Sequence, residues 1–488
     1  MSYTKLAARV VAGAWCGVLL CIAGLVAGAG EELRLHRFDT DPKWELFGET
    51  TGGAPVRLIV QDFGWRPTNK AGGAAPGEIG GVISRSLTRA VYWTKIPQKT
   101  LNDKLSISGR FAVVRTGNGS GMHFGFFHET SSGWRTPNSL VFRLSGEDKE
   151  RRGQYSWALA DLGNRNWKAD GVGAFDGIYQ TTKTEPIKSD GKPHDFAVVY
   201  DPDGANGLGE ISITIDGHTW KNALQPGHKQ EGAVFNRFGL MNLQVSGVDM
   251  EVYLDDIRIN GELLDFTQDP GWEGIGNKTR FEDRDLRPWH DLRWSPTNRA
   301  GGDPGEIAVT MWRDERPAYF AAPIATVTLD QPLHAEGRLA FTGAGSDSGV
   351  CLGWFNADSK RNKRDPEVQH PAANFLAIAI EGPSRIGHYF RPIYSTSVQG
   401  IRGDAGSGPI IRPDAKQRRW SIDYDPAAAG GKGQITVALD GETVVLELKP
   451  DARKAGATFD RFGFFNIQNG GHYVKVFIDD VKYTGSAQ

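Results

Sequence analysis

Apolar and polar residues alternate with a period of two along much of the chain. In the clearest runs, residues 211–215 and 435–439, large apolar residues (Ile, Val or Leu) alternate with Ser, Thr or Ala. Successive side chains of a β-strand point to opposite faces, so this alternation predicts half-buried strands. Each run meets an Asp-Gly pair, at 216–217 and 440–441, and the alternation then resumes. Both residues of such a tight turn need positive φ, so each pair predicts a β-hairpin.

The same pattern predicts strands throughout the chain. No amphipathic segment is longer than two helical turns, and Gly, Pro, Asn and Asp separate the predicted strands. Many short strands with turn residues between them favour an all-β fold made of two-sheet sandwiches. The other predicted strands are residues 105–114, 122–127, 140–144, 196–200, 237–243, 252–259, 333–341, 350–355, 375–380, 420–424, 461–467 and 474–483.

Three segments of the first half recur in the second half in the same order and at similar spacing. This order predicts a tandem duplication of a unit of about 225 residues. The predicted domains are residues 30–262 and 263–488, preceded by a segment of residues 1–29. The repeated segments are 65–79 and 294–307, 235–244 and 459–468, and 253–257 and 477–481.

Composition agrees with a folded, turn-rich protein. Of the 488 residues, 62 are Gly and 25 are Pro, while 39% are hydrophobic and 23% are charged. This composition excludes a disordered or collagen-like chain. The formal net charge of −2 lacks the basic excess that a nucleic-acid-binding surface needs, so no nucleic-acid partner is predicted.

The first 29 residues read as a secretory signal. Lys5 and Arg9 precede an uncharged run, residues 10–26, which ends at Ala-Gly-Ala, residues 27–29. This order is typical of a signal peptide that is cleaved after Ala29, and it predicts a secreted, periplasmic or extracellular protein with no membrane contact after cleavage. The alternative is a retained membrane anchor, because about seventeen apolar residues approach the length that spans a bilayer.

Cleavage would leave one cysteine of three. Cys351 lies in an apolar run, residues 350–355, and is predicted to be a buried thiol rather than a nucleophile. Without a disulfide, the stability of the exported protein has to come from large apolar cores.

The order of motifs in both halves resembles a known superfamily. Each half has an early Pro-Gly-Glu turn, a central strand with Gly followed by aromatic residues, an Asp-Gly hairpin, the sequence Arg-Phe-Gly-x-x-Asn-x-Gln and a last strand with Asp-Asp. This order is similar to the concanavalin A-like (laminin G or legume-lectin type) jelly-roll superfamily, as found in secreted bacterial carbohydrate-active proteins. The resemblance implies two tandem jelly-roll β-sandwiches whose concave sheets meet a polysaccharide or oligosaccharide.

Two catalytic signatures of sandwich relatives are absent from the sequence. No strand carries the Glu-x-Asp-x-(x)-Glu pattern of laminarinase-like hydrolases, and the Arg-rich, Gln-x-His and Tyr-x-Lys-x-Gly-x-Tyr strands of alginate-lyase-like proteins are missing. The leading hypothesis is therefore glycan binding. The alternatives are a polysaccharide lyase or glycoside hydrolase of unfamiliar type, with its site in the first domain, and a structural or adhesion module.

Differences between the halves indicate where chemistry would lie. His123 and Arg143 occupy central strands of the first half, where the second half has Cys351 and Ala379. A histidine near an arginine can act as an acid/base beside a carboxylate clamp for a uronic acid. The alternative is a polar pair satisfied inside the sandwich, which is the more common arrangement. The catalytic candidates are His123, Arg143, His128 and Tyr155.

Amides and loop aromatics are the candidates for glycan contact. Asn242 and Gln244 lie two residues apart, so they share a sheet face, and Asn466 and Gln468 repeat them. Their amides would bond to sugar hydroxyls or, equally well, form a buried ladder between strands. Flat aromatic rings would carry pyranose rings. The aromatic candidates are Trp134, Trp157, Trp167, Tyr389 and Tyr394.

Late aspartates are candidates for structural calcium. The resemblance implies that Asp255 and Asp479, on the last strand of each half, hold the ion through oxygen ligands. The alternative is that these carboxylates face water. Glu78 and Glu306, after Pro-Gly, are expected to bond to neighbouring backbone amides. Early carboxylates that would complete the calcium sites are Asp39, Asp41, Asp265 and Asp269.

Overall fold

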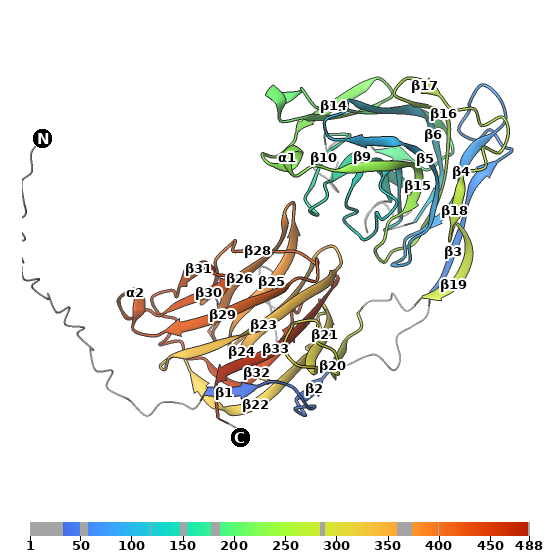
Figure 1. Cartoon of the computed structure of the whole chain (residues 1–488). Coiled ribbons are helices and arrows are strands. Elements are labelled where there is room, and N and C mark those ends of the chain that lie inside the picture. The colour runs from blue at the N-terminus through green and yellow to red at the C-terminus, as the bar shows by residue number, and fades with distance from the viewer. Residues whose placement is uncertain are drawn as a thin grey trace, which may run out of the picture.

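The computed structural model describes residues 33–48, 57–117, 119–146, 154–176, 186–283, 288–358, 373–398 and 400–486. The predicted signal, residues 1–29, lies outside these ranges. Within them the chain is all-β and forms two jelly-roll β-sandwiches, each of two antiparallel sheets (Figure 1). Its α-helices there are single turns, α1 (His228–Glu231) and α2 (Ala428–Gly431), and none is long and apolar enough to cross a membrane.

The first sandwich contains two sheets. The convex sheet has the spatial order β14 (His218–Ala223), β13 (Glu210–Ile215), β12 (Pro193–Asp201), β6 (Leu105–Thr116), β16 (Asp249–Ile259), β4 (Glu78–Ser84), β3 (Arg57–Arg66) and β19 (Lys278–Asp283), with β17 (Glu262–Leu263) on β16. The concave sheet has the order β10 (Ala169–Gly173), β9 (Tyr155–Gly163), β8 (Ser139–Gly146), β7 (Gly121–Phe127), β15 (Val234–Asn242), β5 (Val91–Thr100) and β18 (Glu273–Ile275), with β11 (Ile187–Lys188) on β9.

The second sandwich is built in the same way. Its convex sheet has the order β20 (Asp291–Ser295), β21 (Glu306–Trp312), β33 (Tyr473–Thr484), β23 (Leu333–Ala344), β29 (Gln417–Asp425), β30 (Gln434–Leu439) and β31 (Glu442–Glu447), with β1 (Leu33–His36) on β33. Its concave sheet has the order β2 (Glu45–Phe47), β22 (Tyr319–Thr328), β32 (Thr458–Asn466), β24 (Ser348–Phe355), β25 (Phe375–Ser384), β26 (Gly387–Ser395) and β27 (Arg402–Asp404), with β28 (Ile410–Ile411) on β26.

The predicted hairpins are confirmed. Asp216 and Gly217 have φ of 47° and 85° between β13 and β14, and Asp440 and Gly441 have φ of 50° and 87° between β30 and β31. The strand alternation sends one set of side chains into an apolar core between the sheets of each sandwich. Aromatic rings fill much of the first core, where Phe142 stacks on Phe196 with ring centroids 4.3 Å apart.

The sheets do not divide at the predicted boundary near residue 262. β1 and β2 precede the first sandwich in sequence but pair with β33 and β22 of the second. Conversely, β18 and β19 follow the boundary and pair with β5 and β3 of the first sandwich. In Figure 1 the blue β1 and β2 accordingly lie among the orange and red strands. Each sandwich is completed by a segment that the sequence repeat assigns to the other half.

The Pro-Gly-Glu turn receives the exchanged segment. A Cβ on Gly305, whose φ is 129°, would lie 2.1 Å from the carbonyl oxygen of Phe38, so only glycine permits this approach. The same carbonyl accepts a hydrogen bond from Trp294 Nε1 at 2.7 Å. In the first sandwich, Trp65 Nε1 donates to Phe266 O at 2.8 Å. The turn and the tryptophan before it therefore hold a segment from the other half in both sandwiches.

The glutamate of this turn has the expected structural role. Glu78 is fully buried and accepts hydrogen bonds from the backbone amides of Lys70, at 2.9 Å, and Ala71, at 2.8 Å. Glu306 accepts equivalent bonds from Arg299 and Ala300 at 2.9 and 2.8 Å.

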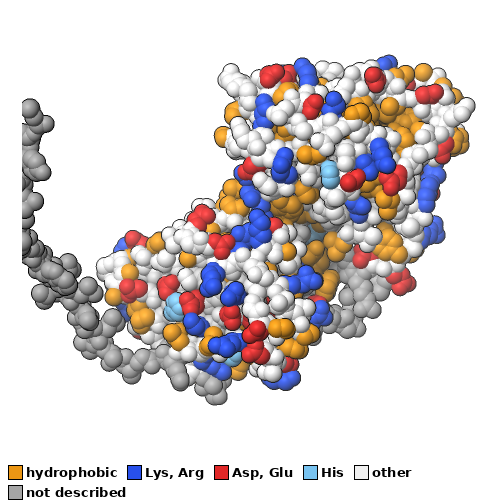
Figure 2. Space-filling view, in the orientation of Figure 1, with side chains coloured by type: hydrophobic (Ala, Val, Ile, Leu, Met, Phe, Trp, Pro, Cys, Tyr) orange, Lys and Arg blue, Asp and Glu red, His pale blue; other side chains and the backbone are white. Residues whose placement is uncertain are grey.

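On the face shown in Figure 2, acidic and basic side chains are interspersed over both sandwiches.

Replacing Trp44 tests the exchange. Trp44 belongs to the first half of the sequence but is 6% exposed within the second core, 5.7 Å from the ring of Phe320 on β22. We expect Trp44→Ala to lower the free energy of unfolding by about 3–5 kcal/mol, because it leaves a cavity in that core. Hydrogen exchange should accelerate in β22 and β32 and stay unchanged in β6 and β16.

Leu46→Ala is the matched control, because Leu46 lies on the same segment with 40% of its surface exposed. Faster amide hydrogen exchange in the first sandwich after Trp44→Ala would contradict the assignment of residues 33–47 to the second sandwich.

Candidate functional site

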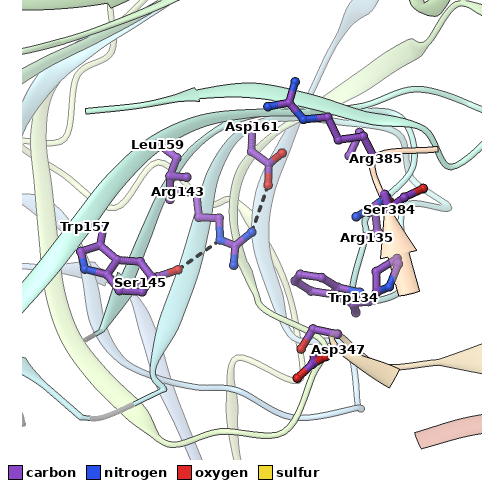
Figure 3. Close-up of a pocket in the computed structure, with 13 residues that line it drawn as sticks. Trp134, Arg135, Arg143, Ser145, Trp157, Leu159, Asp161, Asp347, Ser384 and Arg385 are labelled. Atoms are coloured by element: carbon purple, nitrogen blue, oxygen red, sulfur yellow. Dashed lines mark hydrogen bonds and ion pairs between the residues drawn. The ribbon is translucent and has the colours of Figure 1, made fainter. Parts of the chain in front are cut away.

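A pocket lies at the junction of the two sandwiches (Figure 3). Its cavity volume is about 340 Å³. The first sandwich supplies strands β8 and β9, the start of β10 and the loop before β8, while the second supplies the tip of the β25–β26 hairpin and the loop before β24. The lining residues are Trp134, Arg135, Arg143, Ser145, Trp157, Leu159, Asp161, Ala169, Ser346, Asp347, Pro383, Ser384 and Arg385.

The hairpin tip docks on the first sandwich through backbone and side-chain bonds. The amide of Ala169 donates to the carbonyl of Arg385 at 2.9 Å, and the guanidinium of Arg135 donates to the carbonyl of Ser384. Beside them, Trp167 stacks on His388 of β26 with ring centroids 6.4 Å apart. One wall of the pocket therefore comes from a segment more than two hundred residues away in sequence.

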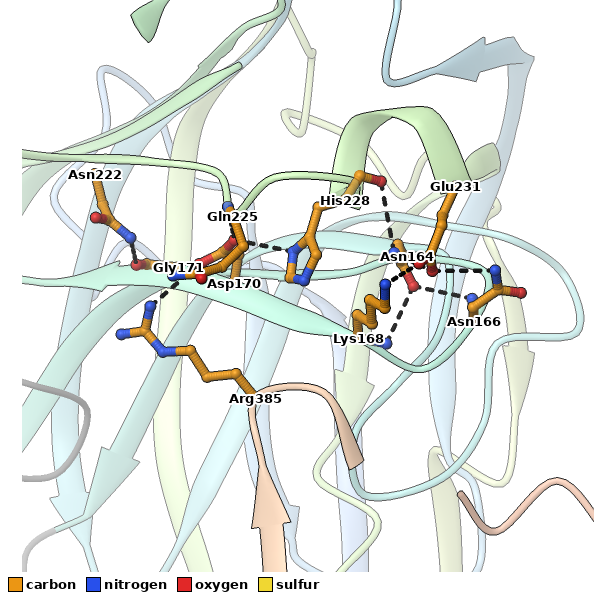
Figure 4. A network of polar contacts seen from close by, with 10 residues as sticks. All are labelled: Asn164, Asn166, Lys168, Asp170, Gly171, Asn222, Gln225, His228, Glu231 and Arg385. Carbon is orange, nitrogen blue, oxygen red and sulfur yellow. Dashed lines mark hydrogen bonds and ion pairs between the residues drawn. The ribbon is translucent and has the colours of Figure 1, made fainter. Parts of the chain in front are cut away.

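A buried carboxylate anchors this contact (Figure 4). Asp170 on β10 is fully buried, and its Oδ1 lies 3.4 Å from a guanidinium nitrogen of Arg385. Its Oδ2 accepts the amide of Gln225 at 2.6 Å and lies 2.9 Å from Nδ1 of His228 on α1. A buried carboxylate needs such partners to offset its lost hydration. The network thus couples the hairpin tip to β10 and α1.

Strand alternation places Arg143 on the pocket floor. Phe142 and Leu144, which flank Arg143 on β8, enter the core, whereas Arg143 faces the concave side. The Arg143 residue is 6% exposed, and its Nε donates to Ser145 Oγ while its Nη1 donates to Asp161 Oδ2, both at 3.1 Å. These two bonds fix the plane of the guanidinium.

Trp134 lies over this guanidinium. The Cζ of Arg143 is 5.6 Å from the indole centroid, within the range of a cation–π contact. The loop that carries Trp134 is held by Gln244, whose Oε1 accepts Ser132 Oγ at 2.7 Å and the amide of Gly133 at 2.8 Å. Among the described residues, Trp134 Nε1 has no hydrogen-bond partner. Gln244 therefore positions the tryptophan from within the protein, with 4% of its surface exposed.

Of the four catalytic candidates, only Arg143 lines the pocket. His123 pairs with Arg143 across β7 and β8 but is 2% exposed, and neither ring nitrogen has a hydrogen-bond partner among the described residues. Burial, with the positive charges of Arg143 and Arg85, holds the pKa of His123 well below its usual value. His128 bonds to Thr130 Oγ1 at 2.7 Å in the loop after β7. Tyr155 begins β9 outside the pocket lining.

The predicted amide surface is replaced by internal bonds. Asn242 is fully buried; its Oδ1 accepts the amide of Ala90 at 2.8 Å and its Nδ2 donates to the carbonyl of Thr88 at 3.0 Å. Asn466 makes the equivalent bonds, to the amide of Ala318 at 2.9 Å and the carbonyl of Arg316 at 2.8 Å. Both amides tie a loop to the sheet, and their burial keeps them out of reach of a sugar. Gln468 is 5% exposed.

The aromatic candidates separate into two groups. Trp134 and Trp157 line the pocket, although Trp157 lies on strand β9 rather than in a loop. Trp167 stands at the rim, with Arg135 Cζ 5.3 Å from its ring. Tyr389 and Tyr394 lie on strand β26; Tyr389 is half-buried, whereas Tyr394 is 1% exposed in the second core, and its hydroxyl accepts the amide of Lys449. The predicted position in loops was thus wrong for Trp157, Tyr389 and Tyr394, which all lie on strands.

The late aspartates lie under glycine loops. Among the described residues, Asp255 Oδ2 and Asp479 Oδ2 are buried without hydrogen-bond partners. A Cβ on Gly73 or Gly302 would lie 1.9 or 2.4 Å from these oxygens, so loop backbone packs directly against them. In the described part of the chain, no group of three or more His, Cys, Asp or Glu residues is arranged to hold a metal ion. Calcium binding by Asp255 and Asp479 therefore stays a prediction, and the proposed function does not depend on it.

Of the residues that line the pocket, the sequence analysis named Trp134, Arg143 and Trp157 and missed the others. Ser145 and Asp161 share the concave face with Arg143, at period-two positions of β8 and β9, which the alternation could have revealed. The hairpin tip, residues 383–385, carries no such signal, because only the docking of the sandwiches brings it to the pocket.

Comparisons with known proteins show distant structural similarity. No protein-family model matches the chain, and no curated protein matches it. Mouse laminin α1 domains LG4-5 are 11% identical, with 85% of this chain and 92% of that chain covered and a TM-score of 0.24. The Emp47p carbohydrate recognition domain is 12% identical, with 40% of this chain and 83% of that chain covered and a TM-score of 0.24. The endo-1,3-β-glucanase of Streptomyces sioyaensis is 13% identical, with 41% of this chain and 76% of that chain covered and a TM-score of 0.20. The function is therefore argued from this chain's own residues.

The buried aspartates make stability depend on pH. Burial, with the negative charges of Asp480, Glu306 and Asp39, raises the pKa of Asp479 from 3.8 to about 7. The folded protein therefore holds a proton that the unfolded chain releases, so this residue costs stability as the pH rises from about 4 to 7. We expect Asp479→Asn to be more stable than wild type by on the order of 2 kcal/mol at pH 8 and equally stable near pH 4, measured by denaturant unfolding.

Asp255→Asn is the matched variant. Burial raises the pKa of Asp255 to about 6, so its effect should level off at a lower pH than that of Asp479→Asn. A calcium-dependent rise in the melting temperature of the wild type, absent from Asp479→Asn, would instead show that Asp479 is a calcium ligand.

Proposed function

We propose that this protein is a secreted glycan-binding protein and that it binds a short segment of a polysaccharide or oligosaccharide between its two sandwiches. The observation that carries the proposal is the pocket in which two tryptophans, Trp134 and Trp157, stand beside the fixed donors of Arg143. Export is supported by the sequence of the first 29 residues.

The chemistry of the lining suits a sugar. Pyranose rings present apolar C–H faces and polar edges, which match flat indole surfaces and nearby N–H and O–H groups. Trp134 and Trp157 supply the surfaces, and Arg143 and Ser145 supply polar groups on the floor. A volume of about 340 Å³ lies at the lower end of the range for small-molecule sites, about 300–1,000 Å³. We therefore expect one or two sugar rings to enter.

Binding is better supported than cleavage. The carboxylates of the lining are Asp161 and Asp347, and each is paired with an arginine: Asp161 with Arg143 at 3.1 Å and Asp347 with Arg313. Both carboxylates are thus tied into ion pairs of the protein, and among the described residues the lining contains no histidine that could serve as an acid/base. His123, which the sequence offered as acid/base, is enclosed beneath the floor.

Trp134→Ala tests the binding proposal. Removing the indole deletes the apolar platform, so affinity for a glycan that the wild type binds should fall at least tenfold in isothermal titration calorimetry. Affinity electrophoresis against a panel of soluble polysaccharides supplies the initial ligand.

Trp220→Ala is the matched control, because Trp220 lies on β14 of the other sheet, where its Nε1 donates to Asp176 at 3.0 Å. Equal affinity for Trp134→Ala and the wild type would sink the proposed site. Release of reducing ends from a bound glycan would show that the pocket also cleaves.

A further inference from the structure

The guanidinium of Arg143 has donors that the protein does not use. Arg143 has five N–H groups, and its contacts with Ser145 and Asp161 involve Nε and Nη1. Among the described residues, nothing accepts a hydrogen bond from Nη2, which Figure 3 shows on the cavity side of the guanidinium. Because Trp134 covers one face and the two bonds fix the plane, this donor edge is rigid before any ligand arrives.

The charge of the lining favours an anion. Arg135, Arg143 and Arg385 are positive, whereas Asp161 and Asp347 are negative, which leaves one net positive charge. The ion-pair partners outside the lining, Asp170 for Arg385 and Arg313 for Asp347, offset each other. A guanidinium presents its N–H groups as a planar fork that matches a carboxylate or sulfate in two parallel bonds. Such a charge-assisted pair is stronger than a hydrogen bond to a neutral hydroxyl.

The second sandwich provides an internal contrast. Its concave sheet has Ala379 and Cys351 at the register position of Arg143 and His123. The nearby Arg391 is bonded to two carboxylates, Glu381 at 2.7 Å and Asp404 at 3.0 Å. Within the described part of the chain, Arg143 pairs with one carboxylate, that of Asp161, and its Nη2 is left to bind another anion.

We propose that the pocket selects an acidic sugar and that Arg143 binds the carboxylate or sulfate of that sugar while Trp134 carries its ring. This inference rests on the proposed glycan-binding function and adds the class of ligand. The hairpin tip of the second sandwich closes the site, with Arg385 supplying positive charge opposite the floor.

The test compares each acidic glycan with its neutral counterpart on the full chain. Oligogalacturonate and alginate oligosaccharides are titrated before and after carboxyl reduction, together with a sulfated galactan and its desulfated form. We expect the acidic forms to bind at least tenfold more tightly than the neutral ones, with an affinity that falls as salt rises. If the wild type prefers the acidic form only in the sulfated pair, the anion is sulfate. If it prefers the acidic form only in the uronate pairs, the anion is carboxylate.

Arg143→Gln should abolish the preference for the acidic form and leave the weaker neutral binding in place. Arg143→Lys should restore part of the preference for the acidic form, because lysine keeps the positive charge but not the planar fork of N–H groups. Arg237→Gln is the matched control: Arg237 lies on β15 of the same sheet, paired with Glu129 at 2.9 Å and outside the pocket. It should bind like the wild type.

Arg143→Gln leaves the carboxylate of Asp161 without its ion-pair partner. The double variant Arg143→Gln with Asp161→Asn is therefore measured as well. Melting curves show whether each variant is folded. The preference should be lost in this neutral double variant too. Equal affinity of the wild type for acidic and reduced glycans would overturn the acidic-sugar inference, and so would an unchanged preference in folded Arg143→Gln. In either case, a loss of binding in Trp134→Ala would still uphold the proposed glycan-binding function. Failure of the wild type to bind any glycan would overturn both.

Discussion

The reciprocal exchange of short segments between the sandwiches is the constraint on which their junction depends. Residues 33–47 complete the second sandwich and residues 262–283 complete the first, so the chain passes between them twice. Two short connections limit the separation of the bodies far more than one would. The exchanged carbonyls of Phe38 and Phe266 approach glycines, where any side chain would collide. The pocket is made of residues from both bodies, and it exists because this topology holds them together.

Burial acts in opposite ways on the two basic residues that meet across β7 and β8. Desolvation disfavours a charge, and a histidine responds by losing its proton, as the depressed pKa of His123 shows. A guanidinium keeps its proton in proteins and has to be compensated instead. Asp161, Ser145 and the indole of Trp134 provide that compensation for Arg143. The histidine is thus enclosed beneath the floor, and the arginine is the charged group that the floor presents to the pocket.

Local patterns predicted the fold well because they record backbone requirements. The Asp-Gly turns at 216 and 440 and the alternating strands follow from positive φ and from the two faces of a strand, which neighbours in sequence decide. The site was predicted only in part. Arg143, Trp134 and Trp157 were identified, but Asn242 and Tyr394 turned out to bond to backbone amides inside the protein. A polar side chain looks the same in sequence whether it meets a ligand or an orphaned amide.

The sequence by itself determined the all-β class, the hairpins, the repeated motif order and the difference between Arg143 and Ala379 on the concave sheets. Tertiary structure alone decided which half completes which sandwich and that residues 383–385 close the pocket over Arg143. The reason is physical. Strand alternation and turn geometry act between residues close in sequence, whereas exchanged edge strands and a docked hairpin are selected by buried contacts, such as Asp170 with Arg385, that link residues hundreds of positions apart.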